Sequence, residues 1–319
     1  MKLFHNTYYD NDRDEFLEAN PQYREENMES WEGLERMAEG YFQWTDSMTP
    51  GTDGDGSPFI GVDNLANYFV AMNHAMGSDI YHYDESGTMV PDLDEGIIEK
   101  LFLNYYEPFT KGYYGAKGRY RSDDVKQSYL AGCIGSSSSV LYFPEEVADS
   151  QGNMVPVTTG VYQYPVMEGT TPTAIQQGAG VAVFNRSDEE NRAALDFIRW
   201  LTIDKGFELA ASMSYMPVDH NGMTEEQKQQ IDDARVLNGI ETGLKQSNSY
   251  QMVYGFDFEN SYDVRTGVDA CFGEALSQGR MEFEEYLARG MSMDEAAASM
   301  DYGSKAEAFY EQVKAIFEE

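Results

Sequence analysis

The sequence has few basic residues, few histidines and only two cysteines. Its 319 residues include 22 Lys and Arg against 56 Asp and Glu, which gives a formal net charge of −34 at pH 7. Because a field of this sign repels phosphate groups, the composition argues against nucleic acid as a partner and against polyanionic ligands. The acidic residues are spread along the chain, which is typical of a solvated surface.

Metal and redox signatures are also missing. Cys133 and Cys271 have no spacing typical of a metal site or a redox pair, so we expect both to be free core residues. None of the four histidines stands in a metal-ligand spacing such as H-E-x-x-H. The sequence therefore predicts no metal and no cofactor.

Catalytic and nucleotide motifs are absent as well. The sequence contains no Walker A motif and no G-x-G-x-x-G, and the Gly-Ser-Ser-Ser-Ser stretch at 135–139 lacks the second Gly of a nucleophile elbow. An EF-hand reading of residues 53–64 fails because Pro58 and Asn64 stand where Gly and Glu are required, so we expect a plain turn. Carboxylate pairs for glycoside hydrolysis stay open, since acids are abundant.

Long apolar runs are missing too. No run reaches the ~18 residues of a membrane span. Residues 1–16 contain no apolar stretch followed by a small-residue cleavage site, so no signal peptide is visible.

The elements that are present mix helices with short strands. Capping-box patterns that open with Ser187, Thr224, Ser292 and Ser304 predict four helix starts. The apolar residues 180–184 predict a short strand. This order predicts an α/β protein without a strict β-α-β alternation.

Several segments suit the binding of a sugar. Residues 136–139 offer small hydroxyls, and residues 176–180 offer two amides and a glycine-rich backbone. Flat aromatic faces are offered by Trp31, Tyr105, Tyr106, Phe109, Tyr113 and Tyr114. Aromatic platforms combined with neutral polar groups are the expected lining of a sugar site. Taken one by one, such segments are more often loops and core.

Taken together, segments in this order resemble a known family. The segments are Leu-Phe-His-Asn at 3–6, Ser-Trp-Glu-Gly-Leu at 30–34, the Gly/Ser-rich stretch at 131–139, Gln-Gly-Ala-Gly at 177–180, Phe-Ile-Arg-Trp-Leu-Thr at 197–202 and Ser-Tyr-Met-Pro-Val at 214–218. Their order and spacing resemble the family 1 extracellular solute-binding proteins, a sugar-binding group that includes maltose- and glycerophosphodiester-binding types.

The resemblance implies a periplasmic-binding-protein-like fold of type II, in which two α/β lobes close on a ligand by a hinge. Residues 1–178 and 219–319 would form a largely complete C-terminal lobe, and residues 179–218 a remnant of the N-terminal lobe. Met1 falls about where the family's long first segment ends, so we expect an N-terminally truncated member.

A remnant without its partner sheet should expose apolar surface. We expect this exposure at Phe184, Phe197, Trp200 and Leu201, unless these side chains dock elsewhere.

The function implied by the resemblance is that of the substrate-binding component of a bacterial ABC importer. The protein would capture a sugar or related polar solute between its lobes and deliver it to membrane permease subunits, without catalysis. It would be a monomer, extracellular or periplasmic, and a membrane-anchored lipoprotein in its full-length form. Two alternatives stay open, a glycoside hydrolase and a decayed surface paralogue that binds nothing.

The resemblance also implies a set of ligand-binding residues. They are Trp31, Ser137, Ser138, Ser139, Gln177, Gly178, Gly180, Tyr215 and Arg265. Trp31 would stack on the ligand, the serines would exchange hydrogen bonds with it, and the glycines would present a backbone N–H at the hinge. Tyr215 would contact the ligand from the first-lobe remnant, where Ser214 replaces the family's usual Gly. For Arg265, a surface salt bridge is an equally good interpretation.

Overall fold

The computed structural model describes residues 24–49, 51–52, 54–148, 153–217 and 223–318. The family-like stretch at 3–6 lies outside these residues, as does Asp53 of the predicted turn.

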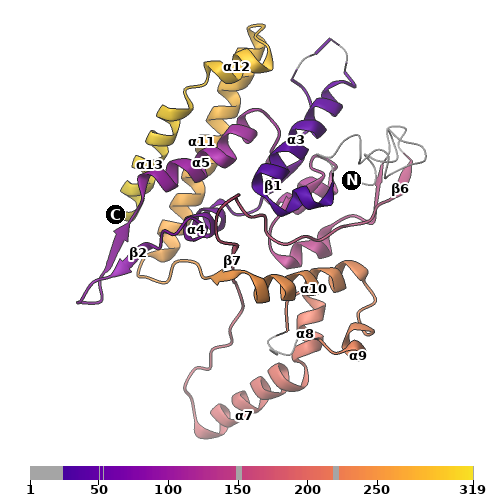
Figure 1. The fold of residues 1–319 in the computed structure, drawn as a ribbon. Helices are drawn as coiled ribbons and strands as arrows, with labels where there is room; N and C mark the ends of the chain where they lie inside the picture. Colours follow the sequence, from indigo (N-terminus) through magenta and orange to yellow (C-terminus); the bar gives the residue numbers. More distant parts are fainter. Residues whose placement is uncertain (1–23, 50, 53, 149–152, 218–222, 319) are drawn as a thin grey trace.

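Helices make up most of the described chain (Figure 1). They are η2 (Glu25–Glu29), α3 (Trp31–Asp46), α4 (Leu65–Ala75), α5 (Glu95–Thr110), α6 (Arg121–Lys126), η3 (Ser137–Tyr142), α7 (Asp188–Arg199), η4 (Trp200–Asp204), α8 (Gly206–Ser212), α9 (Glu225–Lys228), α10 (Ala234–Ser249), α11 (Ser261–Ala288), α12 (Met293–Ser299) and α13 (Tyr302–Glu318).

The strands are short and pair two by two. They are β1 (Ile60–Val62), β2 (Ile80–Tyr83), β3 (Met89–Asp92), β4 (Gly132–Ile134), β5 (Glu146–Ala148), β6 (Met154–Pro156), β7 (Thr173–Ile175) and β8 (Gln251–Val253). β1 pairs with β4 and β7 with β8 in parallel, whereas β2–β3 and β5–β6 are antiparallel. The α/β class predicted from the sequence is confirmed.

An aromatic cluster joins α4, α5, α11 and α13. The ring of Phe102 on α5 stacks on Phe309 of α13 at 4.3 Å between centroids and on Tyr106 at 4.6 Å. Phe272 of α11 meets Phe309 edge-on at 4.7 Å and Tyr68 of α4 at 5.9 Å. All five rings are buried. Aromatic burial of this kind contributes large apolar area and fixes how the helices pack.

Three of the four predicted capping boxes are confirmed, at Ser187, Thr224 and Ser292. The fourth, at Ser304, is wrong because α13 already begins at Tyr302. Asp301 caps this helix end instead, since its carboxylate accepts from the N–H of Ser304 at 3.2 Å.

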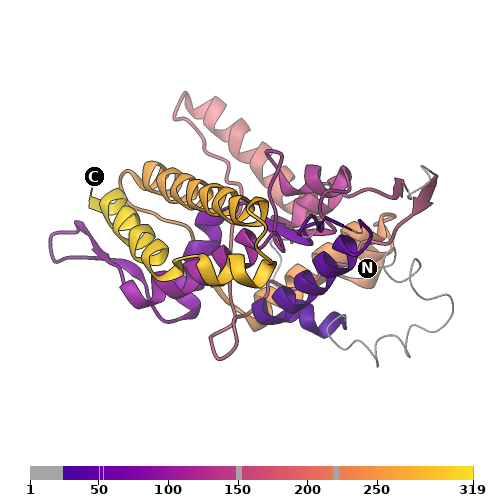
Figure 2. The ribbon, with the colours of Figure 1, turned by 90° about the horizontal axis from the view of Figure 1, so that it is seen from above.

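One arm of the chain, residues 176–204, leaves the body (Figures 1 and 2). Every residue from 176 to 190 is exposed. The strand predicted at 180–184 does not form, because a strand needs a hydrogen-bonded neighbour and the described chain places none beside this segment. The predicted apolar exposure is confirmed at Phe184, which is 82% exposed, and at Phe197 and Trp200, while Leu201 is half-buried.

Both cysteines are free, as predicted, with Cys271 buried and Cys133 half-buried. Burial raises the pKa of Cys133 to about 12 and that of Cys271 to about 11, so both thiols stay protonated and unreactive at neutral pH. None of the described helices is long and apolar enough to cross a membrane.

Two glycines of α11 provide a matched test of the packing between α5 and α11. A methyl group at Gly279 would collide with the buried ring of Tyr106, whereas one at Gly273 would meet no atom within 4 Å. We expect Gly279→Ala to lower the free energy of unfolding by about 1–3 kcal/mol through overpacking. Gly273→Ala should raise it by about 0.5–1 kcal/mol through helix propensity. Urea unfolding of both variants checks this, and equal effects would contradict the packing.

Candidate functional site

The candidate site begins where the parallel strands β1 and β4 end. Val62 pairs with Ile134 at the end of the ladder, and the N–H of Asp63 donates to the carbonyl of Ile134 at 2.9 Å. Asp63 therefore lies beside Gly135, the first residue of the Ser-rich turn. In open α/β folds, ligands bind outside the carboxyl ends of parallel strands. The sequence analysis missed Asp63, although an acid directly after a short buried strand was the available signal.

The Ser-rich turn packs its hydroxyls against this carboxylate. Ser139 hydrogen-bonds to the Asp63 side chain. The Ser136 hydroxyl oxygen accepts from the N–H of Ser138 at 3.4 Å and so caps η3. Ser137, Ser138 and Ser139 are half-buried, so their hydroxyls reach the surface at one edge.

A buried ion pair stands behind Asp63. The Arg121 guanidinium contacts the Asp124 carboxylate at 2.7 Å, and both side chains are almost fully buried. The backbone N–H of Arg121 donates to Asp63 Oδ1 at 2.6 Å. Burial raises the pKa of Asp63 above its ordinary value, although the bonds from Arg121 and Ser139 act in the opposite direction.

Arg265 reaches the same end of the body through α4. Its Nη2 donates to Asn67 Oδ1 at 3.2 Å, in the first turn of α4. One helical turn further along α11, Asp269 accepts from the N–H of Leu65 at 2.8 Å. Arg265 therefore lies at the first turn of α4, the helix that starts two residues after Asp63.

Gln177, Gly178 and Gly180 follow β7 and are all exposed. The N–H of Gln176 extends the β7–β8 ladder by donating to Val253 at 2.7 Å. β7 packs against α4, and the segment before it bonds to the carbonyl of Ala75 at the C-terminal end of that helix. The amino end of β7 therefore lies at the C-terminal end of α4, and Gln177 follows the opposite end of the strand.

Trp31 does not belong to this edge, and the prediction of a stacking face there is wrong. Its side chain is 1% exposed and meets the rings of Tyr68 and Tyr164 edge-on at 5.0 and 5.9 Å. The N–H of Trp31 donates to Val166, which holds the first turn of α3 against the core. The other aromatic faces considered for the ligand are likewise core residues: Tyr105, Tyr106, Phe109, Tyr113 and Tyr114.

Tyr215 lies at the return of the arm into the body and is half-buried. Its N–H donates to the carbonyl of Ala210 at 2.9 Å. The preceding Ser214 is buried and adopts a φ of 52°. A left-handed residue at this point explains why a glycine is the easier choice for such a turn.

The described residues contain no group of three or more His, Cys, Asp or Glu side chains that could hold a metal ion. The predicted turn around residue 54 is confirmed over its described part. Asp46 Oδ1 accepts from the N–H groups of Gly54 and Asp55 at 2.7 and 2.8 Å, which closes this loop.

Two solved structures resemble this chain. One is the cyclic alpha-maltosyl-1,6-maltose binding protein of Arthrobacter globiformis, with a TM-score of 0.53 and 16% identity. The other is a family 1 extracellular solute-binding protein of Alicyclobacillus acidocaldarius, with a TM-score of 0.49 and 11% identity. Each similarity covers 90% of this chain and 64% of the solved one. The chain matches no sequence profile of a protein family and no curated protein sequence.

The first of these similarities shows the fold. The chain is an α/β protein built like a periplasmic solute-binding protein, and it spans 64% of the length of that relative. The fold that the sequence resemblance predicted is confirmed at this level.

The pKa of Asp63 can be tested through stability. A carboxyl whose pKa is raised by folding adds stability below its unfolded pKa and loses that contribution as the pH rises through its folded pKa. We therefore expect the stability of the wild type relative to Asp63→Asn to fall as the pH rises from about 3 to about 7. Urea unfolding at several pH values measures it, with Asp123→Asn, an exposed position on α6, as the control. A rise with pH would contradict the dominance of burial.

Proposed function

We propose that this chain is the substrate-binding component of an ABC importer and that it captures a neutral, sugar-like solute. The observation that carries the proposal is the polar edge at the carboxyl ends of the parallel strands β1 and β4. Asp63 and the Ser-rich turn at 136–139 follow these two strands, and Gln177 follows the carboxyl end of β7 in the neighbouring parallel pair. Hydroxyl, amide and carboxylate groups are suited to bind sugar hydroxyls. The fold supports the proposal, because the relative that shares it is named for binding a cyclic maltosyl-maltose.

The predicted division of the chain enters the proposal. Residues 1–178 and 219–319 form the C-terminal lobe, and residues 179–218 belong to an N-terminal lobe supplied by the rest of the full-length protein. The support is the arm, whose exposed apolar side chains are Val181, Val183, Phe184, Leu195, Phe197, Trp200 and Ile203. An apolar surface of this extent on a protein needs a partner.

Within this proposal, the solute is held between the two lobes near the start of the arm. Gln177, Gly178 and Gly180 form the hinge segment, and Tyr215 lies on the segment that returns to the body. Ser137, Ser138, Ser139 and Arg265 contact the solute from the C-terminal lobe. The protein acts as a monomer outside the cytoplasmic membrane, to which a lipid anchor tethers the full-length form, and it delivers the solute to permease subunits.

A glycoside hydrolase fits the edge less well. Hydrolysis needs two carboxylates about 5–10 Å apart across a cleft, one of them free to transfer a proton. Asp63 has Asp124 as its neighbour, but Asp124 is neutralised by Arg121 and buried beneath the surface. The relatives that share the fold are binding proteins.

Binding can be tested with paired glutamine variants at opposite ends of the β7–β8 pair. Gln177 follows the carboxyl end of β7, whereas Gln251 opens β8 at its amino end, and both are exposed. We expect maltose, maltotriose or cyclic maltosyl-maltose to raise the melting temperature of the chain, since a ligand that binds only the folded state stabilises it. Gln177→Ala should weaken this binding by about tenfold, the effect of losing one or two hydrogen bonds, and Gln251→Ala should not.

Glycerol 3-phosphate serves as the anionic control ligand and should have no effect, because the chain carries a net charge of −34. A melting temperature that no neutral sugar changes would contradict the proposal and favour a surface protein that has lost its ligand.

The arm can be tested separately. We expect the triple variant Phe184→Ser, Phe197→Ser, Trp200→Ser to change the free energy of unfolding by less than about 1 kcal/mol, because these side chains are largely exposed. It should also reduce the binding of an apolar dye such as ANS several-fold. Phe309→Ser, in the buried cluster, is the contrasting variant and should destabilise the fold by about 3–5 kcal/mol. A triple variant that unfolds would show that the arm packs on the body.

A further inference from the structure

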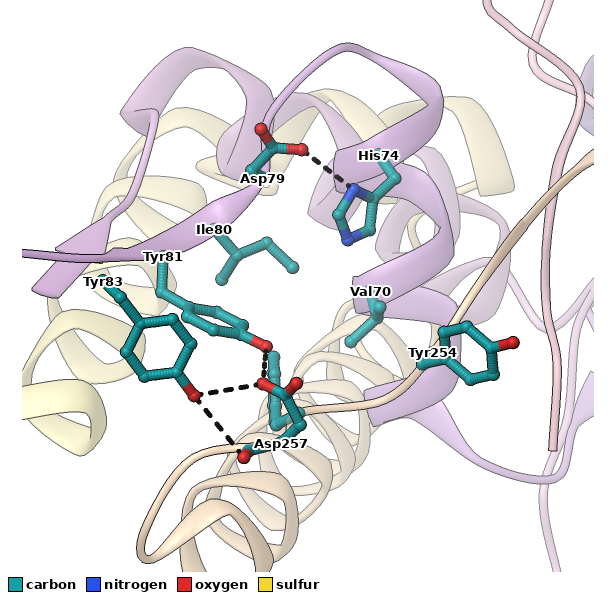
Figure 3. A pocket seen from close by; sticks show the side chains of 9 residues that line it. Val70, His74, Asp79, Ile80, Tyr81, Tyr83, Tyr254 and Asp257 are labelled. Atoms are coloured by element: carbon teal, nitrogen blue, oxygen red, sulfur yellow. Dashed lines mark hydrogen bonds and ion pairs between the residues drawn. The ribbon is translucent and has the colours of Figure 1, made fainter. Parts of the chain in front are cut away.

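A concave site separate from the polar edge lies against the C-terminal half of α4 (Figure 3). It is a partly open cavity of about 250 Å³ between α4, the β2–β3 hairpin and the segment after β8. Its lining residues are Val70, His74, Asp79, Ile80, Tyr81, Tyr83, Tyr254, Phe256 and Asp257. This volume lies below the ~300–1,000 Å³ of pockets for drug-sized ligands, so a fitting occupant has few heavy atoms.

Aromatic rings form the walls of this cavity. Tyr81 and Tyr83 stand at 90° to each other with their ring centroids 6.0 Å apart, and Phe256 meets Tyr81 at 6.2 Å and 71°. Tyr254 stands on the other side and is 67% exposed. Four aromatic rings thus line a small space, and the electron-rich faces of such rings attract cations.

Carboxylates lie at two ends of the cavity (Figure 3). The hydroxyls of Tyr81 and Tyr83 donate to Asp257 Oδ1 at 2.5 and 3.2 Å. At the other end, Asp79 is exposed and lies 3.4 Å from Nδ1 of His74. Burial lowers the pKa of His74 although Asp79 acts to raise it, so the imidazole is neutral at neutral pH. Burial and Asp257 raise the pKa of Tyr81 to about 12, so its hydroxyl keeps its proton. The lining therefore carries net negative charge.

Backbone strain sits at the floor of the same cavity. Ile80 is 1% exposed and has a φ of 71°, a conformation that is rare for a β-branched residue. Strain of this kind costs about 1–3 kcal/mol and is found preferentially at functional sites. Ile80 is the first residue of the β2–β3 hairpin, and the hydroxyls of Tyr81 and Tyr83 in this hairpin donate to Asp257.

We propose that this cavity binds a small organic cation, an ammonium group with apolar substituents. Ring faces, two carboxylates and the apolar side chains of Val70 and Ile80 match a charged group carried on a methylated or alkyl body. A sugar fits less well, because the hydroxyls of Tyr81 and Tyr83 already donate to Asp257, which leaves Tyr254 as the only tyrosine of the lining whose hydroxyl is not bonded to Asp257. A bare metal ion fits less well too, because the described residues bring no three ligating side chains together.

The acidic surface supports a cationic ligand, since a net charge of −34 raises the local concentration of cations. This inference does not depend on the proposed sugar site. The cavity lies along the C-terminal half of α4, whereas the polar edge surrounds the first turn of that helix.

Calorimetric titration with choline and with its neutral isostere 3,3-dimethylbutan-1-ol tests the proposal. We expect choline to bind at least about fivefold more tightly than the isostere at low ionic strength, and more weakly as salt is added. Asp257→Asn and Tyr254→Ala should each weaken choline binding at least about fivefold. The matched controls Asp263→Asn and Tyr262→Ala, an exposed pair at the start of α11, should change it less than about twofold.

Tyr254→Ala keeps the test decisive if Asp257→Asn disturbs the hairpin, because the exposed Tyr254 side chain contributes little to folding. The proposal would be overturned if the calorimetric titration of the wild type with choline gave no heat of binding. Equal binding of choline and the isostere, or choline binding that survives both cavity variants, would overturn it as well. Choline binding that survives both cavity variants would mean that choline only associates with the acidic surface. Sugar titrations of the same variants should match the wild type, so either site can fail without the other.

Discussion

The aromatic packing of α4, α5, α11 and α13 determines where the strands of the body end. The rings of Phe102, Phe272 and Phe309 stack at the centre, and Tyr68 ties α4 to them. With α4 fixed, the segments that contact its first and last turns are fixed as well. β1 precedes the first turn of α4 in the chain, and β7 packs against the same helix. The two ends of one buried helix therefore carry different chemistry.

The polar edge and the arm follow from the limits of hydrogen bonding in strands. A strand that has lost its neighbours stays open, because its backbone N–H and C=O groups have only water to bond with. Residues 180–184 have a strand-like composition but remain extended and unpaired in the described chain. The apolar side chains beside them are exposed for the same reason. This exposure is the observation on which the proposed second lobe depends.

The two sites differ in the charge that they accept. At the polar edge, partial burial disfavours the ionised form of Asp63, and the hydrogen bonds from Arg121 and Ser139 offset only part of this effect. Its neighbours are hydroxyls and amides, which suit a neutral polyol. In the cavity on α4, Asp257 and Asp79 lie among tyrosine rings with no arginine or lysine in the lining. That lining favours a cation, and the overall negative charge of the protein acts in the same direction.

The sequence determined the α/β class, three capped helix starts, the free cysteines and the exposure of Phe184 and Trp200, because local patterns and the missing partner strands control these features. Its order of motifs also predicted the fold that the structural similarity shows. Tertiary structure decided which polar and aromatic residues reach the surface. Trp31 carried the pattern of a ligand platform, yet packing against Tyr68 and Tyr164 put it in the core. The edge at Asp63 and the tyrosine cavity join segments far apart in the chain, and no local pattern encodes such contacts.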